Sequence, residues 1–114
     1  HLSIILHEDI DNPSQKISPL ILIQFIENAF KHGISESLGD AFIHINIQLK
    51  NGILTYFIEN SKEERSHEHS TKIGLKNIRR QLELLYPNHR LTVENKSDRY
   101  IVQLIIDFND KFSS

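Results

Sequence analysis

Residues 17–33 read Ile-Ser-Pro-Leu-Ile-Leu-Ile-Gln-Phe-Ile-Glu-Asn-Ala-Phe-Lys-His-Gly, and this stretch predicts a helix that is buried on most of its sides. Ser18 can cap the helix, and Pro19 suits its first turn, where the missing N–H costs nothing. Gly33 supplies the left-handed residue that ends many helices. Because apolar residues fill nearly every position up to Phe30, we expect this helix to lie in the core of the domain.

Four polar residues of the helix lie on one stripe, at the spacing i, i+4, i+7 and i+8: Gln24, Asn28, Lys31 and His32. Glu27 lies at the edge of this stripe. If the stripe is buried, its groups need partners, because unpaired burial of polar groups costs several kcal/mol. A bound polar ligand can supply such partners. The alternative is that the stripe is simply the solvent-facing side of the helix, and this segment alone favours neither interpretation.

The composition is that of one ordinary globular domain. The 114 residues are 25% charged with a net charge of -2, so they offer no basic surface for nucleic acid or an acidic membrane. The absence of cysteine excludes disulfides and zinc–thiolate sites. No apolar run approaches the roughly 18 residues of a membrane span. Strand-like residues begin at Leu2, and we therefore expect residues 1–114 to be a single domain excised from a longer protein.

Alternating apolar residues predict strands on both sides of the helix, and Asn51-Gly52 is a strong hairpin signal. A second helix is expected to begin at Gly74-Leu75 and to end before Pro87. Residues 59–72 contain no large apolar side chain and read as an exposed loop. The order β-α-β-β-α-β-β predicts an α+β fold, a two-layer α/β sandwich with the helices on one face of a mixed, mostly antiparallel sheet. The strands are expected at residues 2–7, 41–50, 53–58, 91–93 and 100–108.

With these elements in order, the chain resembles the ATP-binding domain of sensor histidine kinases, in the wider family shared with gyrase, Hsp90 and MutL. More narrowly, it is similar to the LytS/YehU type of two-component kinase. The resemblance covers Leu2 to Asp107 and implies the Bergerat-type ATP-binding fold, with residues 60–73 as the ATP lid. It rests on three blocks: Pro19 to Gly33, close to that group's N box; Ile58-Glu59-Asn60-Ser61, where the family has its first glycine box; and Ile73 to Leu82, similar to the second glycine box and its helix.

The first block carries most of the roles that the resemblance implies. Asn28 matches the asparagine that binds Mg²⁺ through its amide oxygen, and Mg²⁺ prefers such hard oxygen ligands. Lys31 and His32 would face the phosphates and the nucleoside of ATP. Gln24 lies where related ATPases place a carboxylate that activates water, and glutamine cannot act as that base. Glu27 is a candidate catalytic acid, with a solvated or lysine-paired acid as the alternative.

The other two blocks match the family less completely. Glu59 aligns with the aspartate that accepts a hydrogen bond from the adenine amino group, and Ser61 stands where the family usually has glycine. Gly74, followed by Leu75, would begin the second helix, whose N-terminal N–H groups suit a phosphate. Lys72 replaces a further glycine, where it can contact a phosphate or stiffen the loop.

The resemblance implies a domain that binds ATP and Mg²⁺ and transfers the γ-phosphoryl group to a histidine. None of the seven histidines is expected on a dimerising helical hairpin, so the substrate histidine should lie on an upstream dimerisation module of the parent protein. The expected partners are that module and a response regulator, without nucleic acid. We expect a monomeric, cytoplasmic domain whose parent is a homodimer anchored in the inner membrane. The alternative is a degenerate, non-catalytic interaction module on the same fold, which Ser61 and Lys72 favour and the intact block from Asn28 to His32 opposes.

Overall fold

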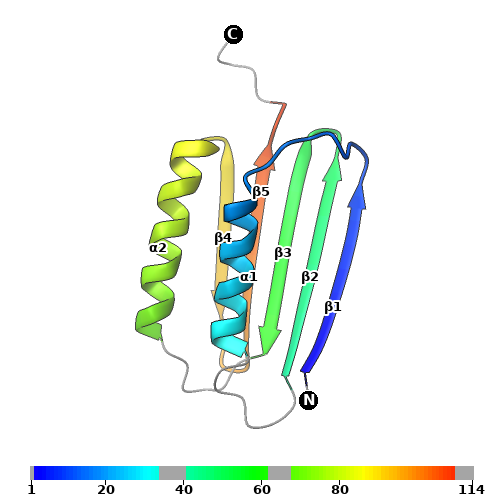
Figure 1. Cartoon of the computed structure of the whole chain (residues 1–114). Helices are drawn as coiled ribbons and strands as arrows, with labels where there is room; N and C mark the ends of the chain where they lie inside the picture. Colours follow the sequence, from blue (N-terminus) through cyan, green and yellow to red (C-terminus); the bar gives the residue numbers. More distant parts are fainter. Residues whose placement is uncertain (1, 34–40, 62–67, 110–114) are drawn as a thin grey trace.

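The computed structural model describes residues 2–33, 41–61 and 68–109 and consists of one sheet with two helices on one of its faces (Figure 1). The sheet has five strands in the order β1-β2-β3-β5-β4; β1 runs parallel to β2, and the other neighbours are antiparallel. This confirms the predicted α+β sandwich. The elements are β1 (Leu2–Ile10), α1 (Pro19–Gly33), β2 (Ala41–Lys50), β3 (Ile53–Ser61), α2 (Glu68–Leu85), β4 (His89–Asn95) and β5 (Arg99–Asp107).

The core lies between the helix layer and the central strands, because alternate residues of each strand point toward the helices. On β5 the buried residues are Tyr100, Val102, Leu104 and Ile106, as the predicted alternation requires. The rings of Phe25 on α1 and Tyr56 on β3 pack in a T-shaped arrangement, with centroids 5.7 Å apart. The remaining buried apolar residues are Ile21, Ala29, Ala41, Ile43, Ile45, Leu49, Leu54, Ile58, Ile78 and Leu82.

The turn between β2 and β3 confirms the hairpin prediction. Asn51 and Gly52 both adopt positive φ, at 53° and 78°, as a two-residue turn of this kind requires. The turn also lies against the end of β5, because the Phe108 amide donates to the Gly52 carbonyl at 2.8 Å. A Cβ on Gly52 would collide with the side-chain amide of Asn109, so glycine fits this position for both reasons.

The segment between β3 and α2 differs from the prediction of an exposed loop over residues 59–72. Residues 59–61 belong to β3, and Asn60 is fully buried. The helix α2 begins at Glu68, so Gly74 lies inside the helix and does not start it. The prediction failed because polar residues can end a strand or form the exposed first turns of a helix without burying apolar surface. Of the predicted lid, residues 62–67 lie outside the described residues.

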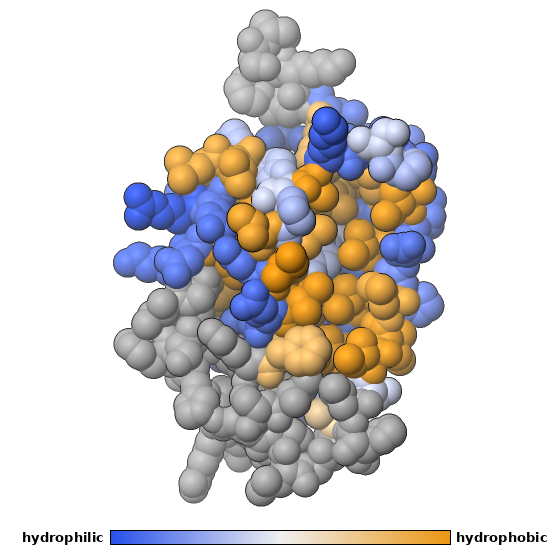
Figure 2. All heavy atoms as spheres, in the orientation of Figure 1, coloured by the Kyte–Doolittle hydropathy of each residue, from blue (hydrophilic) through white to orange (hydrophobic). Residues whose placement is uncertain are grey.

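The helix-bearing face is divided into an apolar and a hydrophilic side. Figure 2 shows apolar side chains over α1 and the neighbouring β1 edge, and hydrophilic side chains over α2. The exposed large apolar residues of α1 and β1 are Ile4, Ile5, Leu6, Ile10, Leu20, Ile23 and Phe30. No helix in the described ranges is both long and apolar enough to cross a membrane.

Candidate functional site

The three sequence blocks meet at one end of the molecule, drawn at the bottom of Figure 1. The two helices run in opposite directions along the sheet, so α1 ends where α2 begins. The antiparallel strands β3 and β5 also meet there, β3 with its last residues and β5 with its first. Lys31 and His32 lie on the last turn of α1, and Lys72 and Gly74 lie in the first turns of α2. Only the backbone of these four residues belongs to the described part of the chain, so their predicted ligand contacts stay predictions.

Asn28 is buried, with 7% of its surface exposed, and its side chain points toward the sheet. Its Nδ2 donates a hydrogen bond to the Tyr100 hydroxyl at 3.3 Å. An amide oxygen on a rigid helix, such as Oδ1 of Asn28, is a suitable hard ligand for Mg²⁺. No group of three or more acidic, histidine or cysteine residues gathers within the described residues, and a single-oxygen magnesium contact does not need one.

Burial also determines the protonation state of the Tyr100 hydroxyl, which accepts the hydrogen bond from Asn28. Desolvation raises the pKa of Tyr100, while the hydrogen bond from Asn28 and the charge of Arg79 lower it by less. The hydroxyl is therefore neutral at physiological pH and can both accept and donate a hydrogen bond.

Gln24, one turn before Asn28, is also turned into the protein. Its Oε1 is buried and has no hydrogen-bond partner in the described part of the chain. The solvent-face interpretation of the polar stripe is therefore wrong for both Gln24 and Asn28. Glu27, by contrast, is exposed, which fits the solvated alternative better than a catalytic role.

Glu59 does not face the helices, which contradicts its predicted contact with adenine. On β3 the helix-facing positions alternate through Ile58 and Asn60, so Glu59 lies on the opposite, uncovered face of the sheet. There its Oε2 accepts a hydrogen bond from Nη1 of Arg99 at 2.8 Å, and its Oε1 lies 3.7 Å from Nδ1 of His44. The sheet would separate this carboxylate from a nucleotide base bound beside α1.

Ser61 shares the uncovered face with Glu59. Its Oγ accepts a hydrogen bond from the Phe42 amide at 2.9 Å and so joins the end of β3 to the start of β2. The Ser61 hydroxyl is therefore turned toward β2.

Asn60 is the polar residue of this block that the sequence analysis missed. It is fully buried on the helix-facing side and is the register partner of Tyr100 on β5. Its Nδ2 donates to the Ser61 carbonyl at 2.9 Å, while Oδ1 has no partner among the described residues. A buried acceptor without a donor costs about 1–3 kcal/mol. Counting the strand alternation onward from Ile58 would have identified it.

Asn28, Tyr100 and Asn60 thus form a polar cluster in an otherwise apolar core, which we call the amide cluster. Asn28 reaches it from α1, Tyr100 from β5 and Asn60 from β3. Buried polar groups in folded proteins usually satisfy one another. Oδ1 of Asn60 has no such partner in the described part of the chain, so the cluster has an acceptor to offer to a ligand.

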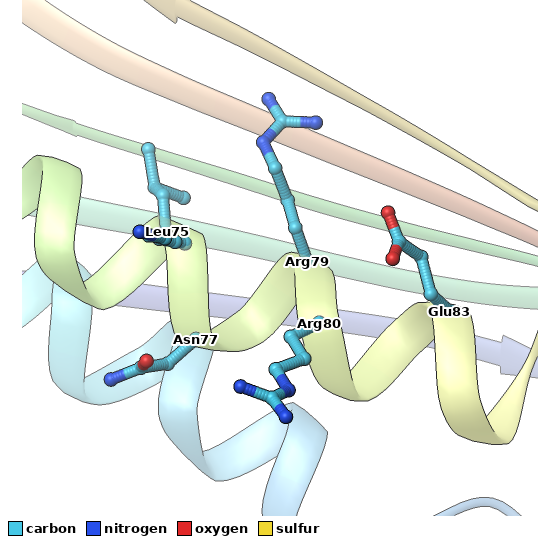
Figure 3. Close-up of a pocket in the computed structure, with 6 residues that line it drawn as sticks. Leu75, Asn77, Arg79, Arg80 and Glu83 are labelled. Atoms are coloured by element: carbon cyan, nitrogen blue, oxygen red, sulfur yellow. The ribbon is translucent and has the colours of Figure 1, made fainter.

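A cationic cavity of about 650 Å³ opens along α2. Its lining includes three basic side chains and one acidic side chain. In Figure 3, Asn77 and Arg80 extend toward the side of α1, whereas Arg79 and Glu83 extend the other way. The helix α2 that carries this cavity packs against α1, which carries Asn28. The lining residues are Leu75, Lys76, Asn77, Arg79, Arg80 and Glu83. A net positive cavity of this kind favours an anion.

Comparisons with known proteins identify the fold. No protein-family model matches the sequence, and no curated protein is similar to it. Among solved structures, the histidine kinase domain of the blue-light-activated kinase from Erythrobacter litoralis is similar at a TM-score of 0.68 and 15% identity, over 94% of this chain and 55% of that one. The nucleotide-free catalytic domain of the histidine kinase ThkA is similar at 0.61 and 18% identity, over 92% and 78%.

A third structure, ThkA in complex with the response regulator TrrA, matches at a TM-score of 0.56 and 17% identity. The match covers 93% of this chain and 34% of that one, so the chain spans about a third of ThkA in that complex. Together with the sheet order and the two helices on one face, these matches show that the chain has the fold of histidine kinase catalytic domains.

Proposed function

We propose that the chain is the ATP-binding catalytic domain of a two-component sensor histidine kinase of the LytS/YehU type. The observation that carries the proposal is the buried amide cluster, which α1, β3 and β5 form together, and the cationic cavity along the neighbouring helix α2 supports it. A nucleotide bound with Mg²⁺ presents a polar base, an anionic triphosphate and a cation, and the buried amides and the basic residues of α2 offer polar and cationic partners to these groups. The fold similarity to histidine kinase catalytic domains supports the choice of nucleotide and of reaction.

Asn28 would hold Mg²⁺ through its Oδ1, and the phosphates and water would supply the other ligands. The basic groups of the α2 cavity, Arg79 and Arg80 among them, would lower the energy of the triphosphate charge. The remaining proposed contacts with the phosphates and the nucleoside follow from the sequence resemblance: Lys31, His32, Lys72, Gly74 and Leu75.

Phosphoryl transfer requires little covalent chemistry from the protein. Positioning of the nucleotide and neutralisation of its charge supply most of the acceleration. Gln24 supports a kinase over a hydrolase, because its buried amide cannot take a proton from water. The γ-phosphoryl group would pass to a histidine that another module supplies.

The proposed partners lie outside this chain. The dimerisation module of a homodimeric parent, anchored in the inner membrane, would carry the acceptor histidine, and a response regulator would then receive the phosphoryl group. The structure of ThkA with the response regulator TrrA supports such a partner by analogy of fold. The chain by itself would be a monomeric domain on the cytoplasmic side.

A degenerate, non-catalytic module on the same fold is the second candidate. Three observations favour it: Glu59 is turned away from the helices, Gly74 lies inside α2, and Asn60 is covered. Such a module would bind nucleotide weakly and would signal through contact with another protein.

Calorimetric titration with ATP, in the presence and absence of Mg²⁺, separates the two candidates. The proposal predicts micromolar binding that Mg²⁺ strengthens, because the cation links Asn28 to the phosphates. Titration with inorganic triphosphate is the matched control and should give weaker binding, since it lacks the base. Undetectable binding with and without Mg²⁺ would contradict the catalytic proposal and favour the interaction module.

A further inference from the structure

The chain has three tyrosines, and the hydroxyl of each makes a hydrogen bond to the same helix, α1. In order along the helix, the bonds join the Ser18 amide to the Tyr86 hydroxyl at 2.6 Å, the Tyr56 hydroxyl to the Leu22 carbonyl at 3.0 Å, and Nδ2 of Asn28 to the Tyr100 hydroxyl at 3.3 Å. At a rise of 1.5 Å per residue, these contacts span about 15 Å of the helix axis. The tyrosines therefore hold α1 at both ends of this span and between them.

Tyr86 is the tyrosine farthest from the amide cluster. It directly follows α2, and its amide donates to the Leu82 carbonyl at 2.7 Å. Its ring packs on the Phe108 ring in a T-shaped arrangement, with centroids 5.9 Å apart, and its carbonyl lies 2.6 Å from Nδ1 of His89. Tyr86 thus joins the start of α1 to the ends of α2 and β5 and to the start of β4, opposite the candidate site (Figure 1).

The rotation of α1 about its axis is not the one that its apolar residues alone would select. Asn28 is buried, whereas Leu20, Ile23 and Phe30 are 62%, 48% and 39% exposed. Phe30 follows Asn28 by two residues, so the two side chains leave the helix about 200° apart. Burial of apolar surface is non-directional, and it distinguishes only weakly between rotations of a helix that is apolar on nearly all sides. Hydrogen bonds are directional, and those to the tyrosine hydroxyls can make this distinction.

We infer that the tyrosine hydroxyls fix the rotation and the axial position of α1, and that Tyr86 is a positioning residue for Asn28. Tyr86 acts through the helix: its hydroxyl holds the Ser18 amide, and the rigid turns of α1 carry that constraint to Asn28. Tyr100 holds the Asn28 side chain itself, and Tyr56 holds the helix between them. The effect on nucleotide affinity rests on the proposed function, whereas the effect on α1 does not.

The test replaces Tyr86 with phenylalanine, which keeps the ring on Phe108 and removes only the hydroxyl. In the ligand-free chain, the side-chain amide resonance of Asn28 should shift, although Asn28 lies about 15 Å along the helix from Ser18. The affinity for ATP with Mg²⁺ should fall about threefold to tenfold, equivalent to the loss of one ordinary hydrogen bond. A role limited to local stability would move only resonances beside Ser18 and position 86.

Ile106→Val is the matched control. Ile106 is buried on β5 as the register partner of His89, at the same end of the sheet as Tyr86. Loss of one methyl group should lower the melting temperature about as much as loss of the hydroxyl, while all three tyrosine bonds remain. The Asn28 resonance and the affinity for ATP should therefore match those of the unchanged chain.

The outcomes separate this inference from the proposed function. An Asn28 resonance that is unchanged in Tyr86→Phe, or that shifts equally in Ile106→Val, would overturn the inference and leave the proposed function standing. If the unchanged chain does not bind ATP, the proposed function fails, and the ligand-free resonances still decide the positioning of α1. If Tyr86→Phe does not fold, hydrogen exchange in the unchanged chain decides. The Ser18 amide should exchange as slowly as that of Phe25 in the middle of α1, and rapid exchange would contradict a hydroxyl that holds the helix.

Discussion

Replacing Asn28 with alanine is expected to weaken the binding of ATP in the presence of Mg²⁺ by about tenfold or more, equivalent to at least about 1.4 kcal/mol. The substitution removes Oδ1, the proposed magnesium ligand, together with the 3.3 Å hydrogen bond to Tyr100. Loss of that bond should lower the free energy of unfolding by only about 1 kcal/mol. Calorimetry with and without Mg²⁺ measures the effect, and binding without Mg²⁺ should change much less.

Asn46→Ala provides the matched control for this experiment. Asn46 is an exposed asparagine of β2, so its replacement removes the same chemical group from a surface position. It should leave both the affinity and the melting temperature nearly unchanged. If Asn28→Ala melts far below the unchanged chain and still binds ATP with full Mg²⁺ dependence, Asn28 has a structural role and the proposed metal contact is wrong.

Incubation of the chain alone with γ-labelled ATP is expected to yield no phosphohistidine, whereas addition of the parent's dimerisation module should give strong labelling of that module. Within the described residues, His7, His44 and His89 lie on strands of the sheet. His44 faces the uncovered side of the sheet beside Glu59, so it cannot approach a γ-phosphate held on the helix-bearing side. We therefore expect phosphohistidine only when the dimerisation module is present.

Acid-labile label, detected after separation of the two proteins, is the readout of the transfer experiment. A dimerisation module whose acceptor histidine is replaced by glutamine should remain unlabelled. The Asn28→Ala chain should label the intact module slowly, because it holds MgATP poorly. Rapid self-labelling of the chain in the absence of any module would overturn the proposed division between the catalytic domain and its substrate.

The fold could be predicted from the sequence because its signals are local and repeated. The apolar helix ending at Gly33, the alternation along residues 41–50 and the turn at Asn51-Gly52 each specify one element. The start of α2 at Glu68 could not be predicted in this way. A polar segment at the end of a helix carries neither apolar periodicity nor a compact turn signal, so its helical and loop states look alike in sequence.

The candidate site was harder to predict than the fold, and the incorrect part of the prediction concerned a single residue. Motif alignment placed the ligand contact at Glu59, but successive strand residues point to opposite faces of a sheet. The structure turns Glu59 outward to Arg99 and turns Asn60 inward to the amide cluster. Asn28, in contrast, could be singled out because a polar side chain on a helix buried on most sides is conspicuous in sequence.

The α2 cavity could not be predicted because it depends on how α2 lies against α1. The sequence showed basic residues after Gly74, but a charged helix is most often a solvated surface. Packing of α2 beside α1 leaves Asn77 and Arg80 extending toward the side of α1 (Figure 3). A cavity of this kind is a property of the packed helices, which no local pattern encodes.

The most direct test of the central proposal is to map MgATP on the folded chain by nuclear magnetic resonance, because it locates the ligand without a substitution. The side-chain amide signals of Asn28 and Asn60 are expected to shift strongly and to saturate together at one affinity. The side-chain amide of Asn46, on the exposed surface of β2, should not move. Saturable shifts of Asn28 and Asn60 are the predicted result; binding that shifts residues elsewhere and leaves both amides unchanged would contradict a nucleotide site at the amide cluster.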